Sequence, residues 1–298
     1  MNPLLMAQVF SILTAIGFSA GDSSVRLALR TSTPITGILT LALLILLIYG
    51  PIAVATFPLK EIDSLGLLVF VAAGVASPGL AGTLYYMSFR RIGLSRSSTI
   101  GACAPLIMVL IAVVALGERP TPLVYLGTLL IMAGVAALAR EQRSASRREP
   151  RGKSVWHYFI FAVLAMLMFA VAAALRKVGL SMIPSLSVAL SLAAIGTLLV
   201  VALWHPFLPQ EDRVKISRHN IGYFLASGIL SSSGHLAFFA ALQRGPLSTV
   251  APLVYTTPLF ALAFSWLLFR EVERLNSRLV AGALIVCAGA VLVTMSRV

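Results

Sequence analysis

Two ionisable side chains, Asp22 and His235, stand inside long apolar stretches of this sequence. A carboxylate can bind an ammonium group or carry a proton, and a neutral imidazole can donate one hydrogen bond or take up a proton. Because ionisable groups are costly in apolar surroundings, both are candidate functional residues. Each also has a simpler interpretation: Arg26, one helical turn after Asp22, can form an internal ion pair with it, and His235 can be a packing residue.

The apolar stretches around these residues are long enough to cross a bilayer. Hydrophobic residues make up 59% of the chain and charged residues 11%, with a mean hydropathy of +0.96, which excludes an ordinary soluble domain. A helix needs about 20 apolar residues to span the hydrocarbon core, and runs without strict alternation favour helices over barrel strands. The predicted spans are 4–29, 35–57, 65–89, 97–116, 122–139, 156–175, 183–204, 221–242, 249–269 and 277–295.

The two halves of the chain carry the same rare residues in the same order. The pairs are Arg26 with Arg176, Pro34 with Pro184, Pro105 with Pro258, Glu118 with Glu271, Gly127 with Gly282, and Gly134 with Gly289. Each half has an odd number of spans, so the second half must cross in the opposite direction. We therefore predict an all-α membrane protein of ten transmembrane helices, built as two inverted five-helix repeats, 1–139 and 155–298, joined by a basic linker, 140–154. Inverted repeats of this kind are typical of secondary transporters.

Four of the paired glycines predict close helix packing. Gly127 and Gly134, like Gly282 and Gly289, are seven residues apart and lie on one helix face. Missing side chains let a neighbouring backbone approach closely. We expect the fifth and tenth spans to pack at the edge of the bundle through these glycines.

The paired prolines and glutamates mark the fourth and ninth spans. Pro105 and Pro258 are expected to bend their helices, either as static kinks or as part of a cavity or hinge. Glu118 and Glu271 each end a span beside an arginine. A charge contact at the helix end is favoured for both over proton carriage.

The net charge of +13 arises at the span ends and in the linker. The positive-inside rule explains this distribution without a nucleic-acid partner. Assigning the 23 Lys and Arg to loops places 17 on the linker face, with Arg176 and Lys177 counted on the opposite face. The count predicts a cytoplasmic linker and both termini outside.

The sequence resembles the EamA domain of the drug/metabolite transporter superfamily along nearly its whole length. The first span, with Gly17 and Phe18 ahead of Arg26 and Pro34, is similar to that domain's first helix. The segment RRIGLSRSSTIGACAPLIMVLIAVVALGERPTPLVYLGTLLIMAGV, repeated as QRGPLSTVAPLVYTTPLFALAFSWLLFREVERLNSRLVAGALIVCAGA, is similar to its last helices. The resemblance implies an exporter of amino acids or similar small amphipathic metabolites in a bacterial plasma membrane. Alternatives are a multidrug or lipophilic-cation exporter, and a membrane receptor or assembly subunit that transports nothing.

The candidate binding residues are expected around a central cavity formed by spans one, three and four and by their counterparts six, eight and nine. They are Phe18, Asp22, Tyr85, Tyr86, Phe169, His235, Phe239, Tyr255 and Thr256. Apolar and aromatic walls suit a neutral, zwitterionic or weakly cationic molecule. A phosphorylated cargo would need several cavity arginines, and those available are expected near span ends. The hydroxyls of Tyr255, Thr256 and Thr257 can instead cap carbonyls freed beside Pro258.

Other function classes find no support in the motifs. HExxH and paired intramembrane aspartates are absent from the sequence, as is a phosphate-binding loop for ATP, and four scattered histidines with one deep aspartate form no catalytic constellation. Cys103 and Cys287 stand alone, and no cofactor or metal is expected. The related small multidrug transporters carry a carboxylate where Phe18 stands, so their proton exchange cannot be transferred to this chain. Protons stay a candidate coupling ion through Asp22 or His235, and downhill transport is the alternative.

Overall fold

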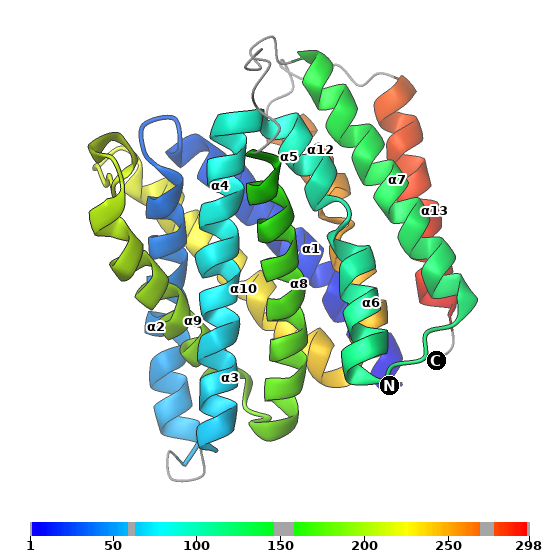
Figure 1. Cartoon of the computed structure of the whole chain (residues 1–298), viewed down its shortest axis with the longest axis horizontal. Helices are drawn as coiled ribbons and strands as arrows, with labels where there is room; N and C mark the ends of the chain where they lie inside the picture. The colour runs from blue at the N-terminus through cyan, green and yellow to red at the C-terminus, as the bar shows by residue number, and fades with distance from the viewer. Residues whose placement is uncertain (1, 59–62, 146–157, 269–276, 297–298) are drawn as a thin grey trace.

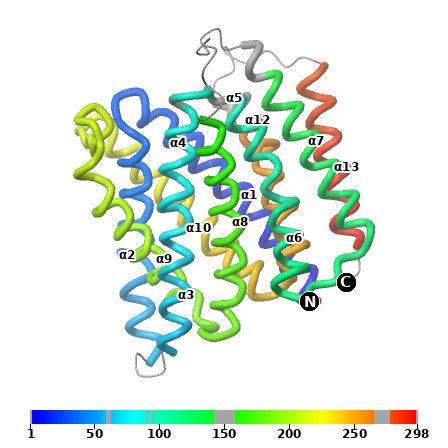
Figure 2. The backbone as a smooth tube through the Cα atoms, in the orientation of Figure 1, coloured from blue at the N-terminus to red at the C-terminus, as the bar shows by residue number. Residues whose placement is uncertain are grey.

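The computed structural model describes residues 2–58, 63–145, 158–268 and 277–296. In this part of the chain, ten helical spans are long and apolar enough to cross a membrane. Helices form because only internal hydrogen bonding satisfies the backbone in lipid. The predicted all-α architecture of two inverted repeats is confirmed (Figures 1 and 2).

The first repeat contains spans one to five. They are α1 (Pro3–Ala28); α2 (Pro34–Thr56); a third span made of α3 (Ser64–Gly74), a π-helical segment (Val75–Leu80) and α4 (Ala81–Ile92); a fourth made of α5 (Leu94–Gly101) and α6 (Ala104–Leu116); and α7 (Pro122–Ala145).

The second repeat contains spans six to ten. They are α8 (Phe159–Met182); α9 (Leu186–Trp204), followed by the 3₁₀ turns His205–Phe207 and Gln210–Asp212; α10 (Ile221–Arg244); a ninth span made of α11 (Leu247–Val254) and α12 (Thr257–Leu268); and α13 (Ser277–Met295).

The two repeats pack on each other in an exchanged pattern. The first span of each repeat lies on the third span of the other: α1 packs on α10, and α8 packs on α3 and α4. The second and fifth spans instead pack on their own counterparts, α2 on α9 and α7 on α13. We call the end of the bundle where α1 begins and α13 ends the terminus side, and the end where α7 ends and α8 begins the linker side (Figure 1).

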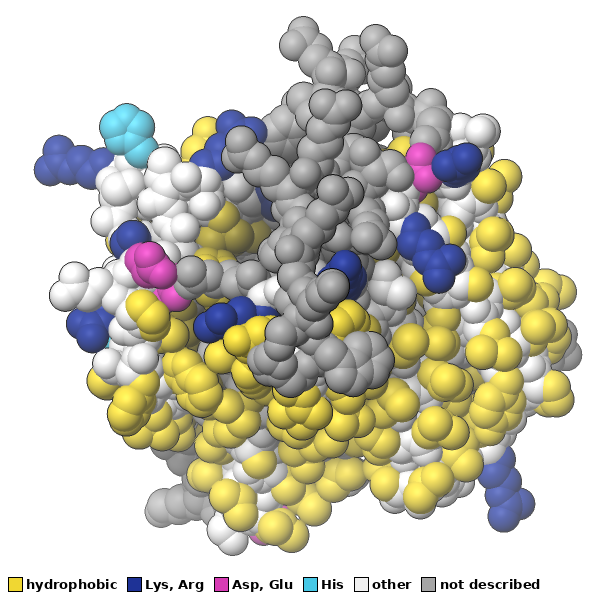
Figure 3. Space-filling view, turned by 45° about the horizontal axis from the view of Figure 1, so that its top comes forward, with side chains coloured by type: hydrophobic (Ala, Val, Ile, Leu, Met, Phe, Trp, Pro, Cys, Tyr) yellow, Lys and Arg dark blue, Asp and Glu magenta, His cyan; other side chains and the backbone are white. Residues whose placement is uncertain are grey.

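The sixth span is longer than the sequence predicted. Instead of ending at Leu175, α8 continues to Met182 and includes Arg176 and Lys177. The helix tolerates Lys177 because its Nζ donates to the carbonyls of Leu242 at 2.6 Å and Gly245 at 2.8 Å. Neither residue is a loop charge, so the asymmetry of basic residues toward the linker side is greater than the sequence count suggested. Figure 3 shows Lys and Arg side chains gathered around that side.

The fourth and ninth spans are interrupted rather than bent. Short turns separate α5 from α6 and α11 from α12, and Pro105 and Pro258 follow them in the first turn of the second half-helix. Proline fits there because its missing N–H has no helical partner to lose. Just before Pro258, Thr256 Oγ1 donates to Leu253 at 2.7 Å and Thr257 Oγ1 to Val254 at 2.6 Å. The capping of a freed carbonyl is thus confirmed for Thr257, whereas the Leu253 carbonyl that Thr256 binds also accepts the Thr256 N–H at 3.1 Å.

The predicted glycine packing of α7 against α13 is confirmed. A Cβ atom on Gly134 would lie 2.8 Å from the Gly282 carbonyl oxygen, and one on Gly127 would lie 2.7 Å from that of Gly289. The two backbones therefore approach too closely for side chains at these positions. Both helices lie at the edge of the bundle (Figure 1).

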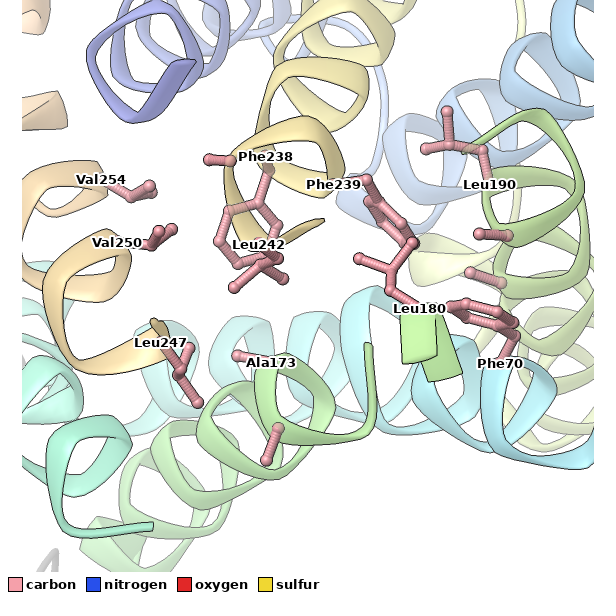
Figure 4. Packing of buried hydrophobic residues seen from close by; sticks show 14 of the residues in the cluster. Phe70, Ala173, Leu180, Leu190, Phe238, Phe239, Leu242, Leu247, Val250 and Val254 are labelled. Carbon is pink, nitrogen blue, oxygen red and sulfur yellow. The ribbon is translucent and has the colours of Figure 1, made fainter. Parts of the chain in front are cut away.

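Buried apolar side chains from both repeats form the main core. Phe70 of α3 and Leu180 of α8 lie in one cluster with Phe239 of α10 and Leu247 of α11 (Figure 4). This cluster joins the third, sixth, eighth and ninth spans. Phe18, Phe169 and Tyr255 pack against it.

Candidate functional site

Asp22 is an exposed carboxylate on a membrane-spanning helix. It lies on α1, six residues before the helix ends at Ala28, and its side chain is exposed although the helix spans the membrane. Tyr85 of α4 lies within electrostatic range of the carboxylate. Asp22 forms no hydrogen bond or contact ion pair with any residue in the described part of the chain, and Arg26 acts on it only at longer range. The simple ion-pair interpretation is therefore not supported at contact distance.

Aromatic rings lie on the side of Asp22 that faces α4. The ring of Tyr85 lies 6.2 Å from Phe169 of α8, nearly perpendicular to it, and 4.3 Å from Phe89. Its hydroxyl bonds with Ser98 of α5, and Tyr255, in the interruption of span nine, lies within electrostatic range of Tyr85. All five side chains are partly exposed. The structure thus brings Tyr85, Phe169 and Tyr255 together with Asp22.

Phe18 and His235 meet where α1 crosses α10. A Cβ atom on Gly17 would lie 2.7 Å from the Gly234 Cα, so glycines allow this crossing. The ring of Phe18 packs edge-on against His235 with 4.7 Å between centroids. His235 Nδ1 lies 2.8 Å from the Ser231 carbonyl oxygen.

This contact fixes what a neutral His235 can do. A carbonyl oxygen only accepts, so Nδ1 must carry the hydrogen, which leaves Nε2 as an acceptor. The sequence prediction that neutral His235 donates to a bound molecule needs correction, because its one donor is already bound to Ser231. His235 can instead accept a hydrogen bond.

Arg176 belongs to the interior, although the sequence placed it at a span end. Its side chain is 5% exposed, and its guanidinium carbon lies 5.7 Å from the ring centre of Phe238 and 5.5 Å from that of Phe239. Nη2 donates to the carbonyl of Ser77. That carbonyl is free because Ser77 has an extended backbone conformation that breaks the third span. His235 lies within electrostatic range of Arg176.

A signal for this position exists in the sequence. The apolar run does not stop at Arg176 and Lys177 but continues to Pro184, the next strong helix breaker. Pro78, inside the predicted third span, likewise marks the break that exposes the Ser77 carbonyl. Together they would have indicated a charged residue inside the bundle.

Three predicted site residues lie elsewhere. Tyr86 lines a lateral pocket of about 460 Å³ between α2, α4 and the end of α9, where its hydroxyl donates to Asp212 at 3.3 Å. Phe239 is 1% exposed and packs in the core beside Phe70, beneath the Arg176 guanidinium. Thr256 is also 1% exposed, with its hydroxyl hydrogen bound to Leu253.

Polar contacts tie the two repeats together on the terminus side. Glu118, at the end of span four, accepts from the Leu247 N–H at 2.7 Å, the Ser248 N–H at 2.9 Å and the Ser248 hydroxyl at 2.6 Å. The carboxylate thereby caps the N-terminus of α11, where backbone N–H groups lack helical partners. The predicted helix-end contact exists, but its partner is α11 rather than Arg119. The equivalent Glu271 lies outside the described residues.

We call these contacts, with those of Lys177 to the end of α10, the terminus-side closure. They join α6 and α8 to α10 and α11 on one side of the membrane. Asp22, in contrast, is exposed in the linker-side half of α1. The interior therefore offers a carboxylate, an imidazole acceptor, tyrosine hydroxyls, ring faces and a guanidinium behind a closed end.

The sequence matches known membrane transporters, and the fold matches a solved structure. A sequence model of the EamA-like transporter family matches residues 5–140 and 156–295. The pseudopaline exporter CntI of Pseudomonas aeruginosa is 30% identical over 112 residues in both strain UCBPP-PA14 and strain PAO1, and this match spans 38% of each relative and of this chain. A crystal structure of another protein shares the fold with a TM-score of 0.80 at 14% identity, over 97% of this chain and 96% of the other. The chain belongs to the EamA-like transporter family and is a multi-pass membrane protein.

Proposed function

We propose that this protein exports small amphipathic organic molecules, amino acids first among them, across a bacterial plasma membrane by alternating access. The observation that carries the proposal is Asp22, an exposed carboxylate without a contact partner among the described residues, inside a membrane-spanning bundle. Tyr85, Phe169 and Phe18 provide aromatic faces around it. Such a space suits a molecule with an apolar body and an ammonium group.

The inverted repeats supply the means of alternating access. We propose residues 1–139 and 155–298 as the two units that rock against each other, joined by residues 140–154. The terminus-side closure holds one end shut, and the repeat symmetry provides an equivalent closed arrangement at the other end. A cytoplasmic linker side would let the exposed Asp22 meet cargo from inside the cell, which suits export, and the pseudopaline exporters support this direction.

The experiment is efflux from liposomes that contain the purified protein. The liposomes are loaded in turn with radiolabelled phenylalanine, leucine and alanine, and efflux is followed with and without an inward proton gradient. Efflux above protein-free liposomes supports the proposed substrate class. Efflux accelerated by the gradient means proton antiport, whereas efflux indifferent to it means a facilitator. No flux of any amino acid would reject the amino-acid class.

Export of lipophilic cations is the second candidate. The same Asp22 carboxylate, next to the Tyr85 and Phe169 rings, favours a flat or quaternary cation through charge and cation–π attraction. Tetraphenylphosphonium efflux from the same liposomes separates the two candidates. Cation efflux without amino-acid efflux would favour this alternative.

A further inference from the structure

The Arg176 guanidinium has unused hydrogen-bonding capacity in the interior of the bundle. One nitrogen, Nη2, donates to the Ser77 carbonyl. Nε is fully buried and has no partner. Nη1 also has no partner among the described residues, and unlike Nε it is not completely covered. Part of the guanidinium therefore reaches open space.

Arg176 also lacks a counter-charge. In the described part of the chain, no Asp or Glu forms an ion pair with it, and its guanidinium contacts the Ser77 carbonyl and the rings of Phe238 and Phe239. Cation–π attraction to the two rings offsets only part of what an unpaired charge costs in a membrane interior. An anion arriving from the cavity would meet a preformed, incompletely satisfied cation.

We propose that Arg176 binds a carboxylate of the transported molecule. The inference rests on the proposed transport function and narrows its substrate class to carboxylate-bearing amphipathic molecules. Nη1 and the second hydrogen of Nη2 can donate to two carboxylate oxygens, the paired geometry for which arginine is suited. His235, within electrostatic range of Arg176, offers its Nε2 as an acceptor for the neighbouring ammonium group.

The position of Arg176 separates its role from that of Asp22. Arg176 lies six residues before the terminus-side end of α8, and Asp22 lies six residues before the linker-side end of α1. Gly21, beside Asp22, lies against Ser231 of α10, whereas the Arg176 guanidinium lies over the rings of Phe238 and Phe239. Asp22 and Arg176 are therefore separated by about eight residues along α10, roughly 12 Å. A single α-amino acid cannot bridge them. Its α-carboxylate therefore belongs at Arg176, beside the closed end, with His235 as the acceptor for its ammonium group there, whereas Asp22 meets the ammonium group of a molecule that enters from the linker side, before it reaches Arg176.

The test compares an acid with its amide. Purified full-length protein in nanodiscs is titrated at equilibrium with radiolabelled phenylalanine and with phenylalaninamide, which lacks the carboxylate. Wild type is expected to bind the acid at least about tenfold more tightly, as one charged hydrogen bond would give. Arg176→Met should remove the preference, and Arg176→Lys should retain part of it.

The repeat counterpart of Arg176 provides the matched control. Arg26→Met makes the same change on α1 and should keep the preference of wild type for the acid. Equal binding of acid and amide by wild type would overturn the inference whatever the variants do, including an Arg176→Met protein that fails to fold. A preference that persists in folded Arg176→Met would also overturn it. Binding of neither ligand would reject the amino-acid class together with this inference, whereas equal binding rejects only the role of Arg176.

Discussion

Asp22 and His235 have no ionisable counterparts in the other repeat, because Ala172 and Gly82 occupy the equivalent positions. Residues shared by the repeats, such as the paired glycines and prolines, build contacts and helix interruptions that both halves need. Under the proposed function, the unshared residues meet a substrate that binds in one orientation only. The candidate functional residues are therefore ones that differ between the two repeats, whereas the shared residues build the scaffold.

Replacing Asp22 tests whether this carboxylate couples transport to protons. Asparagine keeps the shape but cannot bind a proton, so Asp22→Asn is expected to lose the acceleration of efflux by an inward proton gradient and to retain slower, gradient-independent efflux. The measurement is the ratio of efflux rates with and without the gradient. Asp63→Asn is the control, because Asp63 caps α3 through the Gly66 N–H outside the spans. An unchanged ratio in Asp22→Asn would exclude Asp22 as the coupling residue.

Sequence reasoning found Asp22 but not the place of Arg176, for a physical reason. A lone carboxylate in an apolar run stands out because nothing nearby in the sequence can neutralise it except Arg26. Arg176 is followed by Lys177, and such a basic pair usually marks a helix end. What keeps Arg176 inside is a carbonyl at Ser77 and two rings on α10, all distant in the sequence. Local composition cannot reveal partners of that kind.

At the scale of elements, the end of α6 and the start of α11 act as one unit. Glu118 supplies three hydrogen-bond acceptor contacts across the repeats, so its charge stabilises both the α11 N-terminus and the contact between repeats. The proposed alternating access requires this unit to separate. Under that proposal, the terminus-side closure sets the balance between the two access states.

Glu118→Gln is expected to weaken the terminus-side closure. The amide removes the negative charge at the α11 N-terminus, which is worth roughly 0.3–1 kcal/mol. A cysteine replacing Ala251, which is fully buried in α11, should then react faster with a membrane-impermeant maleimide. Cys103 and Cys287 are first replaced by alanine.

A second glutamate serves as the control for this variant. Glu141→Gln on α7 removes the same charge far from α11, beside Arg278 at 3.9 Å. It should leave the labelling rate of the cysteine at position 251 unchanged. Equal labelling in the Glu118→Gln protein and its parent would mean that Glu118 does not hold the closure.

The contact of α7 with α13 is expected to depend on its glycines. Gly134→Ala places a methyl group 2.8 Å from the Gly282 carbonyl oxygen, and overpacking of this kind costs about 1–3 kcal/mol. Thermal unfolding in detergent should show a lower Tm. Gly222→Ala at the start of α10 is the control, since a Cβ atom there has no neighbour within 4 Å. Equal Tm values for the two variants would contradict tight packing of these helices.

Interruptions of spans four and nine could be anticipated because Pro105 and Pro258 recur at equivalent positions. The break in span three could not be found in this way, since α10, its counterpart, is continuous. A comparison of the two repeats detects only the features that both repeats have. Ser77 and Pro78 form an unshared feature, and the carbonyl that they free holds Arg176.

For the whole molecule, the fold could be predicted because hydropathy and an odd span count dictate two inverted units. The sequence could not predict which end is closed, because in the proposed mechanism one sequence adopts both access states, and these differ by only a small free energy. The closure on the terminus side is a property of side chains that meet across repeats, such as Glu118 and Ser248. The orientation in the membrane decides whether the closed end faces the cytoplasm or the outside, and so from which side cargo can load.

Orientation is therefore the property that most directly tests the export proposal. The gathering of Lys and Arg on the linker side predicts that this side is cytoplasmic. On a background lacking Cys103 and Cys287, Arg119→Cys places a thiol between α6 and α7 on the terminus side, and His219→Cys places one before α10 on the linker side. An impermeant maleimide added to intact cells should label only the cysteine at position 119, and permeabilised cells should show both labelled.

The reverse pattern would change the functional argument. Labelling of position 219 alone in intact cells would place the exposed Asp22 half of the interior toward the outside and the terminus-side closure toward the cytoplasm. The described state would then be ready to load cargo from outside, and uptake would replace export as the favoured direction. The expected pattern makes the same state ready to load from the cytoplasm, with Glu118 and Lys177 holding the exit closed until the repeats exchange conformations.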